Sequence, residues 1–119
     1  MNEKLVVKIP LAYPLSVDSG TIEELVVTHQ ADFYPLFERA IDIDDGRVRL
    51  VEDSLEVVQV DFDETEKSGY VEVDFMSEFY AGCKDMNSDD WHNEELPFRI
   101  ENSTLIFEID LPVRWRVDN

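Results

Sequence analysis

The residues that could carry out covalent or metal chemistry gather between positions 82 and 95, in a stretch that we expect to be a long loop between two strands. Cys83 and His92 could form a thiolate–imidazole pair, since a nearby imidazolium stabilises a thiolate. The many carboxylates of this stretch would instead raise the pKa of the thiol, and nothing in the sequence supplies an oxyanion hole. Thiol catalysis is therefore not our leading hypothesis.

Five side chains of the same stretch could ligate a metal ion. Their spacing matches neither the paired-cysteine pattern of zinc sites nor the regular aspartate and glycine pattern of calcium loops. A small metal-binding or thiol enzyme centred on residues 83–95 is our alternative hypothesis. The five potential ligands are Cys83, Asp85, Asp89, Asp90 and His92.

The rest of the chain offers no recognisable catalytic motif. His29 falls on the apolar stripe of a helical pattern, which predicts a hydrogen-bonded histidine in or beside the core. None of the four glycines lies in a phosphate-binding pattern such as GxGxxG. We therefore expect a protein that is not an enzyme, with no catalytic residue, no metal and no cofactor.

Two tryptophans stand beside charged residues. Trp91 lies in an acidic stretch, where it is either a lid on the core or an exposed interface anchor, and the sequence leaves the two open. Arg114, Trp115 and Arg116 form a small basic and aromatic patch near the C-terminus. We expect this patch to belong to a terminal strand that pairs with an acidic neighbour rather than to a binding site.

Charge is the most unusual property of the chain: its 119 residues include 28 acids and 10 bases, for a net charge of −18 and a pI near 4.1. A globule of this mass exposes about 6,700 Å², so an even distribution leaves one net charge per ~370 Å², roughly 19 Å apart. That spacing exceeds the Debye length of ~8 Å, so only clustered charges act on a partner. Positions 50–98 supply a cluster, with 15 acids and two bases for a net charge of −13.

The acids of this cluster follow the faces of predicted strands. Asp61 and Asp63 share one face of a strand, and Glu72, Asp74 and Glu78 share one face of the next. Side chains on one face repeat about every 6.7 Å and neighbouring strands lie ~4.8 Å apart, whereas a DNA strand carries a phosphate every ~3.4 Å. Two such strands approach the charge density of a nucleic-acid strand. The alternative is that the acids serve only solubility and protection of sheet edges.

The secondary structure that positions these residues is predicted from the spacing of apolar residues, which is helical in one part of the chain and alternating in others. Residues 5–9 alternate as a strand that Pro10 and Pro14 confine to an edge or loop. Apolar residues at helical spacing from Ile22 to Ile41 predict an amphipathic helix, with an N-cap at Ser19 or a Thr21–Glu24 capping box. Pro35 inside the pattern predicts a kink or a split.

After residue 47 the apolar period is two, which predicts half-buried antiparallel strands. Val58, Val60 and Phe62 alternate with polar residues, residues 67–69 form a turn, and Asn102 with Ser103 forms a tight hairpin. The predicted fold class is α+β: an antiparallel sheet of about five strands with a kinked or split amphipathic helix packed on one face. We expect residues 1–119 to form a single domain.

The charge distribution also bears on partners and location. Without clustered bases we expect no direct nucleic-acid binding and no binding to an anionic membrane. No apolar run is long enough for a membrane span, no secretion signal is recognisable, and the single cysteine suits a reducing compartment, so we expect a cytoplasmic protein.

The leading functional hypothesis is a non-enzymatic acidic interaction protein of an inhibitor, immunity or DNA-mimic type, whose acidic sheet face binds a basic nucleic-acid-binding or nuclease protein. An acidic homodimer subunit is a further alternative, so the chain is expected as a monomer or an edge-paired homodimer. The predicted partner-binding residues are Asp61, Asp63, Glu72, Asp74, Glu78, Asp85, Asp89, Asp90, Trp91 and Glu94.

Overall fold

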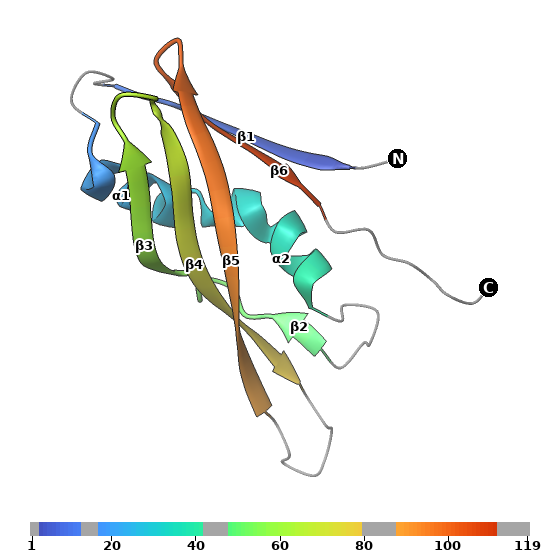
Figure 1. Cartoon of the computed structure of the whole chain (residues 1–119). Coiled ribbons are helices and arrows are strands. Elements are labelled where there is room, and N and C mark those ends of the chain that lie inside the picture. Colours follow the sequence, from blue (N-terminus) through green and yellow to red (C-terminus); the bar gives the residue numbers. More distant parts are fainter. Residues whose placement is uncertain (1–2, 13–16, 42–47, 80–87, 112–119) are drawn as a thin grey trace.

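The computed structural model describes residues 3–12, 17–41, 48–79 and 88–111. Within these ranges, an antiparallel sheet of six strands carries a layer of helices on one of its faces, which confirms the predicted α+β class (Figure 1). The strands are β1 (Lys4–Pro10), β2 (Val48–Leu50), β3 (Glu56–Asp63), β4 (Ser68–Phe79), β5 (Ser88–Glu101) and β6 (Thr104–Asp110). The helical segments are α1 (Ser19–Thr28), a 3₁₀ turn η2 (Gln30–Phe33) and α2 (Tyr34–Ala40).

The sheet is a meander from β3 to β6, with β1 added beyond β6 as an edge strand, as the prolines predict. Strand β4 pairs with β5 along its whole length on one side. On its other side β4 pairs first with β3 and then, at residues 77–79, with β2. The two short partners share one position, so the sheet is five strands wide although it holds six described strands, close to the predicted number.

The turns of the meander use the residues that the sequence indicates. Asn102 and Ser103 both have positive φ, 52° and 63°, as a tight two-residue hairpin requires. Lys67 (φ 57°) ends the turn between β3 and β4. A Cβ atom at Gly69 would lie 1.9 Å from the main-chain oxygen of Asp61, so this close approach of β3 to β4 requires glycine.

One predicted alternation is wrong. Val58 was expected on the apolar face with Val60 and Phe62, but the register with β4 shifts between Val57 and Gln59, and Val58 is 52% exposed. The extra residue is a β-bulge, which changes the phase of the strand, so that Val57 takes the inward position. A period-two pattern in the sequence cannot reveal where a bulge falls.

The helical layer splits at the predicted proline. Pro35 lies in the first turn of α2, where its missing N–H costs no hydrogen bond, and η2 separates α2 from α1. The predicted N-cap is wrong: Asp18, not Ser19 or Thr21, caps α1, with Oδ1 accepting the main-chain N–H of Thr21 at 2.8 Å. That bond and one from the Thr21 hydroxyl hold the pKa of Asp18 below its usual value.

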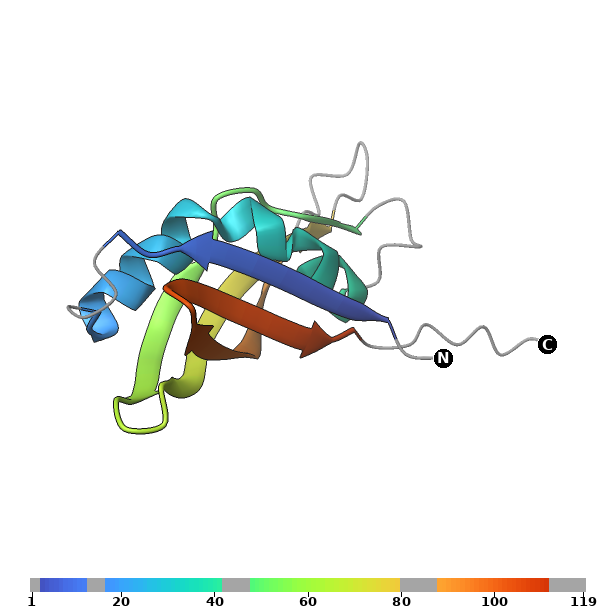
Figure 2. The same ribbon diagram turned by 90° about the horizontal axis from the view of Figure 1, so that it is seen from above.

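The core lies between this layer and the inner face of the sheet. Phe37 of α2 stacks on Phe75 of β4 with ring centroids 4.1 Å apart, and Phe33 meets Phe107 of β6 edge-on at 5.0 Å. Figure 2 shows the helices on one side of the strands only. The other side, which we call the outer face, is therefore free of helices within the described chain. None of the described helices is long and apolar enough to cross a membrane.

The predicted loop at residues 82–95 is wrong over its second part. Strand β5 begins at Ser88, and residues 88–95 pair with β4 in an unbroken register. The charged residues of this stretch hide its strand character, because they have a low intrinsic preference for strands and only pairing with the long β4 makes them extended. Residues 80–87, with Cys83 and Asp85, lie outside the described residues, as do Arg114, Trp115 and Arg116.

Candidate functional site

The register of β3, β4 and β5 brings carboxylates from three strands onto the outer face. Glu72 in the middle strand lies opposite Glu95 of β5, and Glu78 lies opposite Asp89. Asp74 lies opposite Glu56 of β3. All are half-buried or exposed, and those of β4 alternate with buried residues. We call this set the acidic face: Glu56, Asp61, Asp63, Glu72, Asp74, Glu78, Asp89 and Glu95.

The carboxylates of the acidic face lie close enough together to produce a combined electrostatic potential. Strand spacings place the eight groups on a patch of roughly 34 by 14 Å, or one carboxylate per ~60 Å². Their mean separation of about 8 Å equals the Debye length at physiological salt. An even spread of the net charge would have left roughly 19 Å between charges. The acids are therefore close enough to one another to act together on a partner.

An asparagine that the sequence analysis did not single out organises the centre of the acidic face. The side-chain amide of Asn93 on β5 donates hydrogen bonds to Glu72 Oε2 at 2.8 Å and to Asp74 Oδ1 at 2.9 Å. A neutral donor fixes these two carboxylates without cancelling their charge. Asn93 could have been identified only from the cross-strand register, which cannot be read from the sequence. Glu56 and Glu95 were missed for the same reason.

In the part of the chain that the structure describes, cations lie at the two ends of the acidic face rather than within it. Among the ion pairs between described residues, a single one reaches this face, between Arg49 of β2 and Glu78. At the other end, Arg99 of β5 is already bound to Glu101 at 2.7 Å and to Glu108 at 2.8 Å. The centre of the acidic face thus keeps its charge.

Trp91 lies on the same side of the sheet as the acids. It is opposite Met76 of β4 and is 51% exposed, so the interpretation as a lid on the core is wrong. Its neighbours two positions away on β5, on the same face, are Asp89 and Asn93. An exposed tryptophan surrounded by carboxylates offers a partner a flat apolar contact within a charged surface.

Two predicted site residues lie on the opposite side of the sheet. Asp90 is opposite the buried Ser77, and Glu94 is opposite the buried Val73. Glu94 is half-buried there, and this burial raises the pKa of its carboxyl. Neither residue belongs to the acidic face. Of the ten predicted residues, seven share the outer face and one, Asp85, is outside the described chain.

The two histidines have hydrogen-bond partners within the fold. His29 Nδ1 lies 3.0 Å from the main-chain oxygen of Leu25 and is half-buried, which confirms the predicted boundary histidine. His92 Nε2 lies 2.8 Å from Ser77 Oγ, and its ring stacks on Phe75 at 5.1 Å. This serine–histidine pair was not predicted. Ser77 is only 4% exposed, so its hydroxyl pairs with the half-buried His92 and is closed to a substrate.

Of the five assumed metal ligands, the three described ones, Asp89, Asp90 and His92, do not share one face of β5. Asp89 and Asp90 are consecutive in a strand and therefore point to opposite faces. No group of three or more His, Cys, Asp or Glu residues in the described parts of the chain could hold a metal ion.

Comparison with known proteins identifies no relative. No family model matches the sequence, no curated protein matches it, and no solved structure matches the fold. The acidic face with Trp91 is thus the feature from which function has to be argued.

Proposed function

We propose that this chain is a non-enzymatic, cytoplasmic interaction protein whose acidic face binds a basic protein. The observation that carries the proposal is the density of the acidic face: eight carboxylates on three adjacent strands, about one Debye length apart. Among the described residues, a single ion pair, at one end, neutralises part of it. The cytoplasmic location rests on the single cysteine, which suits a reducing compartment.

The basic groove of a nuclease or of a nucleic-acid-binding protein is the chemistry that fits this face best. Such grooves arrange lysine and arginine to meet a line of phosphates, and rows of carboxylates on neighbouring strands offer comparable charge. The protein would then act as an inhibitor, as an immunity protein or DNA mimic does, by occupying the groove. Trp91 supplies the apolar contact that a purely charged surface lacks.

A displacement assay tests this proposal. The chain is titrated into a basic DNA-binding domain loaded with fluorescent duplex DNA, and into oligolysine as the simplest cationic probe. We expect release of the duplex, and an association rate that falls at least about tenfold from low to physiological salt, because steering by clustered charge is screened. Binding that does not depend on salt would contradict the electrostatic mechanism.

Two matched variants separate the acidic face from net charge. The first changes Asp61→Asn, Asp63→Asn, Glu72→Gln and Asp74→Asn, which keeps the hydrogen-bond acceptors but removes four charges. The second removes four charges elsewhere, by Glu23→Gln, Glu24→Gln, Asp32→Asn and Asp110→Asn on α1, η2 and β6. We expect the first to slow association at least about tenfold and the second less than about twofold. Equal effects would show that only net charge matters.

A further inference from the structure

Strand β5 has an open edge in the middle of the sheet. Along one side it pairs with β4 from Ser88 to Arg99, but along the other it pairs with β6 only from Phe98 to Glu101. Figure 1 shows β5 and β6 diverging from their shared hairpin. Over residues 88–97, no described strand pairs with β5 on the side away from β4. We call this stretch the open edge.

The open edge is long and regular. Its pairing with β4 shows no register shift, whereas the pairing of β3 on the other side of β4 is interrupted by a bulge. At about 3.3 Å per residue it is roughly 30 Å long, which is enough for a whole added strand. An edge of this kind presents alternate main-chain N–H and C=O groups that are free to pair with another strand. Pro97, which has no N–H, marks its end.

Charge on the open edge selects what can pair with it. Asp89 and Glu95 lie on the outer side of β5, and Asp90 and Glu94 lie on the inner side. Residues 88–97 contain no lysine or arginine. A second copy of this chain would bring acids beside acids, which is unfavourable in a sheet. An added strand with lysine or arginine would find a carboxylate on either face.

We propose that the open edge accepts an extended basic segment of the partner as an added strand. The inference rests on the proposed function and gives its binding mode. Main-chain hydrogen bonds to β5 hold the segment, and its cationic side chains meet Asp89 and Glu95 on one face and Asp90 and Glu94 on the other. The state of Glu94 supports this arrangement: burial disfavours its charge in the free protein, and a neighbouring ammonium group would stabilise it.

The probe is a peptide of alternating lysine and valine, about nine residues long to match the open edge. A control peptide has the same sequence and charge but is N-methylated at its central amides, so it cannot donate main-chain hydrogen bonds. We expect the unmethylated peptide to slow exchange of the β5 amides that point away from β4 at least about tenfold. The methylated peptide should bind at least about tenfold more weakly. Equal binding of the two would overturn strand addition.

Two double variants with equal charge locate the site. Asp90→Asn with Glu94→Gln alters the open edge, and Asp61→Asn with Asp63→Asn alters β3, on the far side of β4. We expect the first pair to weaken peptide binding about tenfold and the second less than about twofold. The reverse order would overturn the proposal.

The free protein supplies a further test. Amides of residues 88–96 that point away from β4 should exchange rapidly without peptide, because no described strand pairs with them there. Protection before any peptide is added would show that another segment or a second copy already occupies the edge, and would overturn the proposal.

The outcome also separates this inference from the proposed function. If oligolysine binds in a salt-dependent way while β5 exchange is unchanged, strand addition is wrong and docking on the acidic face stands. If no cationic probe binds, both are wrong.

Discussion

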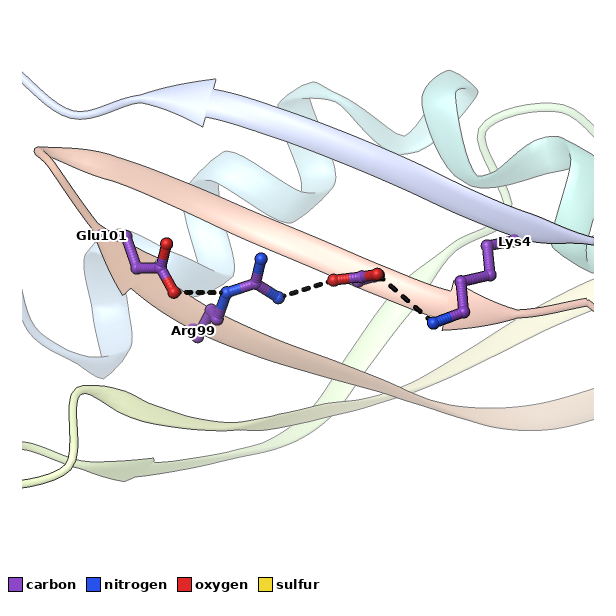
Figure 3. A network of polar contacts seen from close by, with 4 residues as sticks. Lys4, Arg99 and Glu101 are labelled. Carbon is purple, nitrogen blue, oxygen red and sulfur yellow. Dashed lines mark hydrogen bonds and ion pairs between the residues drawn. The ribbon is translucent and has the colours of Figure 1, made fainter.

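The outer face of the sheet has two regions that differ in how their charges are paired. Over β5, β6 and β1, ion pairs form a chain: Lys4 binds Glu108 at 3.3 Å, Glu108 binds Arg99, and Arg99 binds Glu101 (Figure 3). Over β3, β4 and β5, the acidic face holds eight carboxylates with one ion pair among the described residues. The same sheet thus carries a balanced region beside an unbalanced one.

The contrast shows that the fold itself does not prevent cations from pairing with carboxylates on the outer face. Glu72 and Glu95 lie directly opposite each other, whereas on the neighbouring strands Arg99 of β5 lies opposite Ile106 and binds Glu108, two residues further along β6. Like charges in direct opposition cost stability. A neutral residue, Asn93, lies where a cation would have balanced two carboxylates. This arrangement fits selection for an external cationic partner, as proposed above.

The largest expected effect is a loss of binding when Trp91, which lies among the carboxylates of the acidic face, is substituted. Trp91→Ala should weaken binding to the basic DNA-binding domain about tenfold, or ~1.4 kcal/mol, because it removes an aromatic anchor within the acidic face. The free energy of unfolding should change by less than about 0.5 kcal/mol, since the side chain is half exposed. Titration calorimetry and urea unfolding measure the two. Trp91→Phe serves as the control that keeps an aromatic ring. If Trp91→Ala binds as tightly as the wild type, Trp91 is not part of the interface.

A smaller effect, on stability, is expected at the centre of the acidic face. Asn93→Asp places a third carboxylate between Glu72 and Asp74 and should lower the free energy of unfolding by about 1 kcal/mol at neutral pH. The loss should shrink at high salt, because mobile ions screen the repulsion between the carboxylates. Urea unfolding at low and high salt checks this against Asn93→Ala, which loses the amide without adding charge. Equal losses in both variants at every salt concentration would show that repulsion between these carboxylates does not lower the stability.

The smallest effects are pH dependences of opposite sign on the two faces of the sheet, at Glu108 of β6 and Glu94 of β5. Arg99 and Lys4 hold the pKa of Glu108 below its usual value of 4.5, so the stability it contributes is present at neutral pH and is lost as the pH falls through its lowered pKa. Glu108→Gln should therefore destabilise at pH 7 and less so in acid.

Glu94 should behave in the reverse way. Burial raises its pKa above 4.5, so the folded state is favoured at low pH and loses stability as the pH rises through the raised value. Glu94→Gln should thus stabilise the protein at pH 7 relative to wild type, and the gain should disappear in acid. Unfolding curves from pH 3 to pH 7 measure both variants, and slopes of the same sign would contradict the assignment.

Local patterns predicted much of the fold. The helical stripe and Pro35 predicted the split layer, and alternation after residue 47 predicted the meander with its Asn102–Ser103 hairpin. The predictions failed at Val58 and at residues 88–95. In both places pairing with β4 decided the outcome, through a bulge in one strand and through an extension of the other.

The candidate site was predictable in part for the same reason. Alternation assigned Asp61, Asp63, Glu72, Asp74 and Glu78 to strand faces, because that property is local to each strand. Glu56, Asn93 and Glu95 entered the site only through the register, and Asp90 and Glu94 left it because their strand turns them inward.

The sequence by itself determined the acidic composition, the α+β class and the grouping of acids on individual strands, since these depend on residue types and on short-range periodicity. Only the tertiary structure decided which strands lie side by side, that Asn93 joins two carboxylates, and that no described strand pairs with one edge of β5 over residues 88–97. Strand register and strand divergence are set by packing between residues far apart in the chain, so no local pattern encodes them.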